Sequence, residues 1–63
     1  MKLQEISSLI FDDVCLYKKS ADNDYEDLWR GNAQNIPREF LEYTVGIVGA
    51  KRKGIIDIEL RGI

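Results

Sequence analysis

Ile56-Asp57-Ile58-Glu59-Leu60 is the stretch that decides the fold. Aliphatic and acidic residues alternate strictly in it, and a period of two places successive side chains on opposite faces of a β-strand. Such a strand buries its aliphatic side chains against a core and turns its carboxylates away from that core. The stretch therefore predicts a sheet that has one buried face.

The residues before this strand complete a hairpin. β-Branched side chains favour a strand over residues 44–49, and Gly46 and Gly49 within it indicate a bulge or a close approach of another backbone. The run Lys51-Arg52-Lys53-Gly54 is typical of the connecting turn, because glycine adopts positive φ without strain.

A second hairpin is predicted earlier in the chain. Residues 14–18 alternate aliphatic and mixed side chains, and residues 26–30 include Trp29, the largest apolar residue present. The polar stretch 19–24 between them is typical of a loop longer than a two-residue turn.

The apolar spacing changes to that of a helix in two places. Over residues 1–11 the aliphatic side chains recur every three or four positions and share one face. They do so again over residues 36–43, where Pro37 suits the first helical position because its missing N–H costs no hydrogen bond there.

These segments predict a single small α+β domain over residues 1–63, with the order α-β-β-α-β-β. We expect a small antiparallel sheet of about four strands, made of two hairpins, with two short helices on one face. The expected core comprises Leu3, Ile6, Ile10, Val14, Leu16, Trp29, Ile36, Phe40, Leu41, Val45, Ile47, Ile56, Ile58 and Leu60.

Length and composition exclude several classes of protein. The 63 residues are 44% hydrophobic and 32% charged, which is typical of a folded globular chain and not of a disordered one. No apolar run approaches the ~20 residues of a membrane-spanning helix, and no segment has the pattern of a secretory signal. We therefore expect a cytoplasmic protein without a membrane partner.

The chain contains no histidine and a single cysteine, Cys15. Histidine is the usual general base near neutral pH and the commonest metal ligand, so its absence disfavours both kinds of chemistry. Cys15 has no partner for an internal disulfide and lies in a predicted strand, away from any group that would stabilise a thiolate. We expect no enzymatic activity, no cofactor and no metal.

Two patterns are similar to ligand-binding loops but do not match them. Residues 22–27 begin like a calcium loop, yet Asp27 stands where that loop needs glycine and Ala33 where it needs glutamate. Gly46-Ile47-Val48-Gly49 has the GXXG spacing of an RNA-clamping loop, yet its two middle residues are apolar. Neither pattern predicts a site.

Three interpretations of the basic run Lys51-Arg52-Lys53 stay open. Clustered lysines and arginines contact phosphates in nucleic-acid-binding proteins, which makes these three residues candidate phosphate contacts. The run could equally contact an acidic surface of a protein partner, and a solvated hairpin turn explains the same charges. The isoelectric point near 4.9 and the lack of interleaved aromatic residues favour the solvated turn.

One face of the predicted sheet has no helix to cover it. We expect apolar side chains on that face, with Tyr17, Leu28 and Val48 as the candidate surface for a partner or for self-association. An interface of about 800 Å² per chain would stabilise so small a domain more than any surface charge pair. We therefore expect a homodimer. The alternative is a monomer in which Tyr17, Tyr25 and the long stems of lysine and arginine side chains roof the face.

Five short segments carry a resemblance to a known group of proteins: the amphipathic start at Leu3, Ile6 and Leu9, and residues 14–17, 28–31, 35–37 and 56–60. Together they resemble small uncharacterised proteins encoded by phages, prophages and other mobile elements of Gram-positive bacteria. The resemblance implies an accessory gene product and supplies no catalytic or binding residues.

We therefore expect a non-enzymatic protein-interaction or accessory module. The alternative is a nucleic-acid-associated accessory protein that uses the turn at Lys51-Arg52-Lys53.

Overall fold

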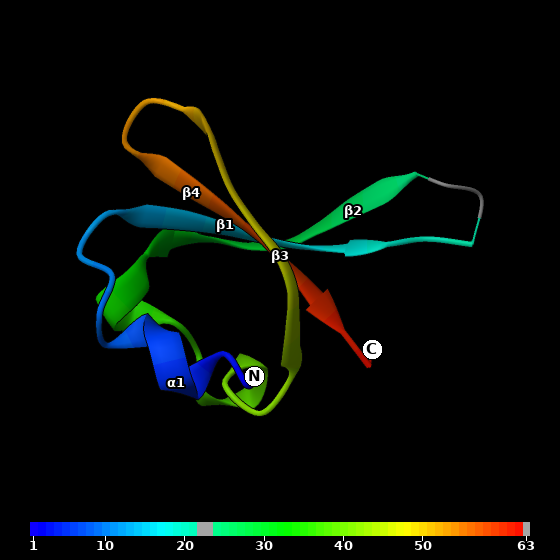
Figure 1. Ribbon diagram of the computed structural model, residues 1–63, viewed down its shortest axis with the longest axis horizontal. Helices are drawn as coiled ribbons and strands as arrows, with labels where there is room; N and C mark the ends of the chain where they lie inside the picture. The colour runs from blue at the N-terminus through cyan, green and yellow to red at the C-terminus, as the bar shows by residue number, and fades with distance from the viewer. Residues whose placement is uncertain (22–23, 63) are drawn as a thin grey trace.

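The chain forms one four-stranded sheet with little helix (Figure 1). The computed structural model describes residues 1–21 and 24–62. In chain order the elements are α1 (Gln4–Ser7), β1 (Asp13–Lys19), β2 (Tyr25–Asn32), the 3-10 helices η1 (Ala33–Asn35) and η2 (Arg38–Phe40), β3 (Thr44–Arg52) and β4 (Ile55–Arg61).

The sheet is mixed, so the expectation of an antiparallel sheet is wrong. Its strand order is β2-β1-β4-β3, which makes the first and last strands neighbours at the centre. Each hairpin pairs antiparallel as expected, but β1 and β4 pair parallel, with Leu16 opposite Ile58. The two hairpins are therefore joined through their most apolar strands.

Burial explains why β1 and β4 are central. Three consecutive residues are buried in each of them, namely 14–16 in β1 and 58–60 in β4. A strand that is covered on both faces belongs inside a sheet, whereas glycine and charged residues are tolerated at edges. β3 contains Gly46 and Gly49, and β2 begins with exposed polar residues, so both of these strands suit the edges.

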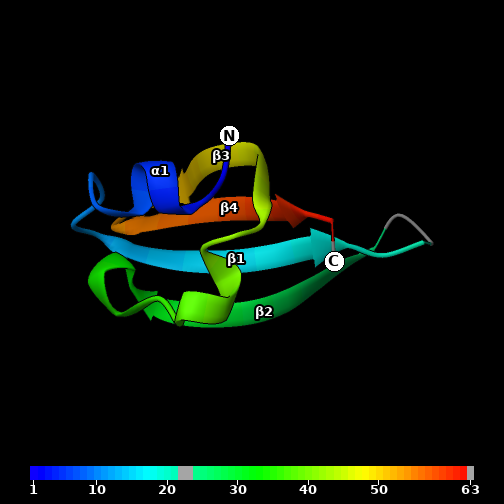
Figure 2. The same ribbon diagram turned by 90° about the horizontal axis from the view of Figure 1, so that it is seen from below.

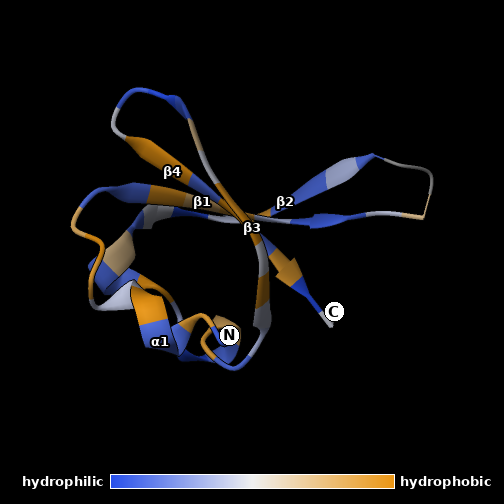
Figure 3. Cartoon of the chain, viewed as in Figure 1, coloured by the Kyte–Doolittle hydropathy of each residue, from blue (hydrophilic) through white to orange (hydrophobic). Residues whose placement is uncertain are grey.

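The core lies between the sheet and the segments that cover one of its faces. Figure 2 shows α1 and the connection from β2 to β3 on the same side of the sheet. The fully buried side chains are Leu3, Val14, Leu16, Ile58 and Leu60. All of the expected core residues belong to this cluster or pack against it except Ile47, which is 52% exposed. Figure 3 shows how the apolar segments gather around this core, while the tip of the β3–β4 hairpin is hydrophilic.

The first helix is shorter than the predicted span of residues 1–11. Met1 and Lys2 instead lie along β3, where Val45 N–H donates to the Met1 carbonyl at 2.8 Å and Lys2 forms a β-bridge with Thr44. Backbone pairing with an edge strand therefore competes with the helix at its start. Only α1 remains, although Leu3 still reaches the core.

The predicted helix over residues 36–43 is not confirmed, because two 3-10 helices occupy this connection. Pro37 precedes η2 in an extended conformation, with φ −57° and ψ 141°, and Ile36 is extended as well. The connection must cross from the β2 edge to the β3 edge, three strand spacings or about 14 Å away. It must also return along the sheet, because β2 ends beside Asp13 and Ile55 whereas β3 begins beside Arg61, about 20 Å further along the strands. Residues 33–43 would span only about 16 Å as one α-helix, whereas extended and 3-10 residues advance further per residue and cover the distance.

The strand pairs contain three register shifts; the third leaves residues 50 and 51 opposite Ile56, and the first two change which side chains face the core. In the β1–β2 pair, Leu16 faces Trp29 and Tyr17 faces Asp27, so Leu28 is an extra residue. In the β3–β4 pair, Leu60 faces Val45 and Ile58 faces Val48, so two β3 residues lie opposite Glu59. Each extra residue inverts the alternation of side chains beyond it. Ile47 is consequently turned away from the core, against expectation.

Gly46 leaves room at the second bulge for an ion pair between a buried carboxylate and an exposed arginine. Glu59 is only 5% exposed, and Arg61 Nε donates to Glu59 Oε1 at 2.9 Å. A Cβ atom added at Gly46 would overlap both of these side chains. The glycine predicted to permit a close approach therefore does so, although the approaching groups are side chains.

Replacing Gly46 with alanine is expected to destabilise the fold by about 1 kcal/mol, because the added methyl group forces the ends of the Glu59 and Arg61 side chains to move and disturbs the pairing of a buried carboxylate. Gly49→Ala is the matched control. A Cβ atom there would meet no heavy atom within 4 Å, so its free energy of unfolding should stay within about 0.5 kcal/mol of wild type. Urea unfolding measures both variants. Equal effects of the two substitutions would contradict the packing described for Gly46.

Candidate binding surface on the open sheet face

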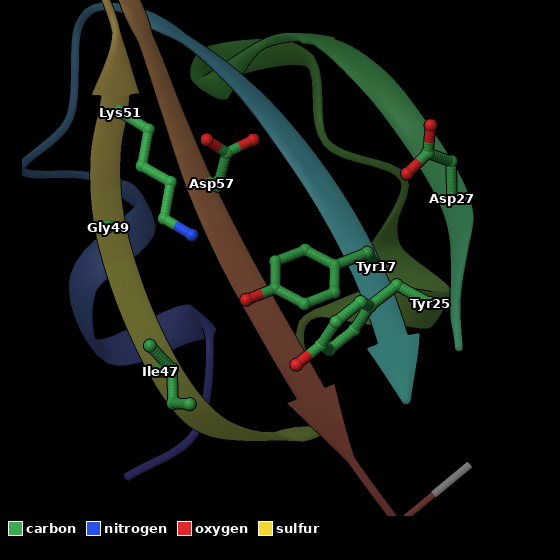
Figure 4. A pocket seen from close by; sticks show the side chains of 7 residues that line it. All are labelled: Tyr17, Tyr25, Asp27, Ile47, Gly49, Lys51 and Asp57. Atoms are coloured by element: carbon green, nitrogen blue, oxygen red, sulfur yellow. The ribbon is translucent and has the colours of Figure 1, made fainter. Parts of the chain in front are cut away.

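The sheet face that points away from α1, η1 and η2 is called here the open face. At its centre lies a shallow hollow of about 300 Å³, to which all four strands contribute (Figure 4). Its lining residues are Tyr17, Tyr25, Asp27, Ile47, Gly49, Lys51 and Asp57. The hollow exists only because the strand order brings β2 and β3 to the two sides of β1 and β4.

Two tyrosine rings form the middle of the open face. The ring centroids of Tyr17 and Tyr25 are 5.4 Å apart with an interplanar angle of 83°, which is an edge-to-face contact. Tyr25 is 63% exposed, and Ile47 across the hollow is also more than half exposed. Large apolar side chains thus gather where no helix of the described chain covers them.

The charges of the open face differ in how they are compensated. Arg52 Nη2 lies 2.8 Å from Asp57 Oδ1, and the Arg61–Glu59 pair is similarly close. Lys51 and Asp27, both exposed, take part in no ion pair among the described residues. Figure 4 shows these two groups on opposite sides of the tyrosine rings. An uncompensated cation and an uncompensated anion therefore flank the aromatic centre.

Cys15 lies under the open face and is not activated as a nucleophile. The side chain is 4% exposed, and its thiol donates to Asp27 Oδ1 at 3.8 Å. Burial, and next the carboxylate of Asp27, raise the pKa of Cys15, and the guanidinium of Arg52 opposes this only in part. A raised pKa favours the thiol over the reactive thiolate, which supports the interpretation of Cys15 as a packing residue.

Tyr17 is held in its protonated form by its surroundings. Burial raises its pKa above the ordinary value of 10.0, and the carboxylate of Glu59 raises it further. The phenol therefore remains a neutral hydrogen-bond donor throughout the neutral range, which suits a contact surface.

The structure separates the three candidate phosphate contacts. Lys51 lies beside the hollow, and Arg52 pairs with Asp57. Only Lys53 belongs to the turn, where it is exposed. Arg52 and Lys51 lie in β3, and the turn itself is Lys53-Gly54, with φ of 77° at Gly54. The run does not present three uncompensated charges to one ligand.

The candidate partner residues Tyr17, Leu28 and Val48 do not share a face. Tyr17 lies on the open face, but Leu28 at the first bulge packs against the core cluster. Val48 pairs with Ile58, and it therefore points to the side that Ile58 occupies, although it is half exposed at the sheet edge.

The sequence did not identify Asp27, Ile47 and Asp57 as residues of this surface, whereas Tyr25 was expected there as one of the side chains that roof the face of a monomer. The signal for Asp57 was present, since it alternates with core residues in the stretch that decides the fold. The other two depend on the bulges, which place Asp27 beside Tyr17 and turn Ile47 outward. A glycine in β3 signalled the second bulge, but no comparable residue marks the first.

Within residues 1–21 and 24–62, no group of three or more potential ligand side chains could hold a metal ion. The start of the calcium-like stretch, residues 22–23, lies outside the described residues. None of the helices in the described part is long and apolar enough to cross a membrane. Comparison of the chain with protein-family models, curated proteins and solved structures gives no significant match.

In the folded protein, Cys15 is expected to react with a thiol reagent at about pH 8 at a rate at least about tenfold below its rate in urea. The reason is that burial and Asp27 both suppress the thiolate. The absorbance of the released reagent measures both rates. A folded-state rate equal to the unfolded one would mean that the thiolate is stabilised, contrary to this description.

The raised pKa of Tyr17 also predicts a loss of stability in alkali. The folded state holds the phenol proton more tightly than the unfolded state, so this stabilisation is complete below about pH 10 and is lost as the pH rises through the raised pKa. Tyr17→Phe should flatten the decline of the melting temperature above about pH 10. Tyr43→Phe, which removes a tyrosine packed against the core, is the control and should leave the decline in place. Identical alkaline slopes for wild type and Tyr17→Phe would refute the assignment.

Proposed function

We propose that this chain is a non-catalytic protein-binding module and that the open face is its binding surface. The observation that carries the proposal is the contact of two tyrosine rings beside an exposed Ile47, in a hollow on an uncovered sheet face. Tyrosine is enriched at the centres of protein interfaces, because it supplies a large contact area at low conformational cost. Contiguous exposed apolar side chains ringed by polar groups are typical of such surfaces.

The arrangement of polar groups also supports binding without catalysis. The one thiol is buried and protonated, and the carboxylates of Asp57 and Glu59 are held in ion pairs with arginines. Groups held in this way fix the shape of the surface and its charge pattern. They offer no activated nucleophile next to a general base, which is the arrangement that covalent catalysis needs.

The nucleic-acid alternative has less support from the geometry. Arg52 and Arg61, two of the cations nearest the open face, are neutralised by carboxylates. Asp27 adds an uncompensated negative charge on the same face, which would repel phosphates. A protein partner is therefore favoured over a nucleic acid.

The proposal includes a biological setting. The resemblance to small proteins of phages and other mobile elements supports an accessory role, in which the module acts by contact with another protein. Flanking genes of phage type would support this setting, and flanking genes of central metabolism would count against it.

The experiment compares the partners of three forms of the full-length chain. Tagged wild type, Ile47→Asp and Phe11→Ser are each expressed beside an untagged copy in the encoding organism, and captured proteins are identified by mass spectrometry. Phe11 is the matched control, because it is a large apolar residue that is 76% exposed and does not line the hollow.

Wild type and Phe11→Ser are expected to capture at least one protein in common, the untagged copy included, that Ile47→Asp loses. A charge placed in the apolar centre should weaken binding strongly, because it would be buried without a partner. Capture of the same proteins by Ile47→Asp, or of none by wild type, would contradict the proposal.

A further inference from the structure

Of the charged residues that line the hollow, Asp27 and Lys51 take part in no ion pair, and they lie on the two edge strands. Asp27 belongs to β2 and Lys51 to β3, and these strands occupy opposite ends of the order β2-β1-β4-β3. Tyr17, on a central strand, lies between them in Figure 4. The lining of the hollow therefore has an anionic end, an aromatic middle and a cationic end.

Such a pattern is complementary to itself. Two copies can pack face to face about a two-fold axis that lies in the interface. If this axis is perpendicular to the line from Asp27 to Lys51 and passes through its midpoint, rotation about it exchanges the two ends. Each Lys51 would then meet Asp27 of the other copy, and the tyrosine-rich middles would meet each other near the axis. In a two-fold symmetric interface, each contact occurs twice: a residue of the first copy contacts a second residue of the other copy, and the same pair meets again with the copies exchanged.

The surface needed for such an interface is available. A standard interface buries about 800 Å² per partner. That is less than a fifth of the 4391 Å² that this chain exposes. The apolar centre formed by Tyr17, Tyr25 and Ile47 would supply most of the binding energy, and the flanking charges would set the orientation of the two copies.

We infer that the partner bound by the open face is a second copy of this chain, packed face to face about a two-fold axis with reciprocal Lys51–Asp27 contacts. The inference rests on the proposed function, because it takes the open face as the binding surface. It assigns the homodimer expected from the sequence to a surface that keeps Tyr17 but has neither Leu28 nor Val48 at its centre.

Charge reversal tests the inference directly, with sedimentation equilibrium of the full chain at micromolar concentration. Wild type should have a mass near twice the 7.3 kDa of the monomer. Lys51→Asp alone and Asp27→Lys alone should each raise the dissociation constant by about tenfold or more, because both symmetric contacts become repulsive. Lys53→Asp makes the same change of net charge in the exposed turn and should leave the mass unchanged.

An equimolar mixture of the two single variants should recover association. In the mixed dimer one copy has carboxylates at both contacts and the other has ammonium groups at both, so both contacts are attractive again. The double variant Lys51→Asp/Asp27→Lys should also dimerise. Asp27→Asn, which changes the shape of the side chain little, is the second variant and should weaken association less than Asp27→Lys. Circular dichroism confirms that each variant is folded.

The outcomes separate this inference from the proposed function. A wild-type mass of 7.3 kDa that is unchanged at tenfold higher concentration would overturn the dimer, while capture of a different protein by the open face would leave the proposed function standing. Single variants that stay dimeric, or a mixture that fails to recover association, would overturn the reciprocal Lys51–Asp27 contacts.

Discussion

The parallel pairing of β1 with β4 is the constraint on which the rest of the structure depends. Leu16 and Ile58 face each other across it, and both are fully buried. Because the pairing places the first and last strands at the centre, β2 and β3 become opposite edges, and the segment between them must cross the sheet. That segment brings Ile36, Phe40 and Leu41 to one face, completes the core there and leaves the other face open.

The chemistry of the open face depends on two of the three interruptions of regular alternation. The bulge at Leu28 places Asp27 beside Tyr17, and the bulge opposite Glu59 turns Ile47 outward. Without them, Ile47 would lie in the core, and the tyrosines would have no apolar neighbour across the hollow. Bulges are often found where a strand has to redirect side chains for function, and here they convert an ordinary sheet face into an aromatic surface between opposite charges.

The sequence was sufficient to predict the four strands, both hairpins and nearly all of the core, because burial on one face leaves a clear period of two, as in Ile56, Ile58 and Leu60. It could not reveal the parallel pairing, which is a choice between strands far apart in the chain. The helix over residues 36–43 was mistaken for a similar reason. Its apolar spacing is real, but the distance to be crossed favours 3-10 and extended backbone. Of the candidate surface, Tyr17 followed from alternation, while Asp27 and Ile47 required the bulges.

The surroundings of Ile47 test the central claim most directly, since this residue is on the open face only if both the strand order and the second bulge are correct. A nuclear Overhauser spectrum of the labelled protein at low concentration measures them. We predict contacts from the Ile47 methyl groups to the rings of Tyr17 and Tyr25, which line the same hollow. Contacts from those methyl groups to Phe40 and Leu41 of the core, and none to the two tyrosines, would contradict the account.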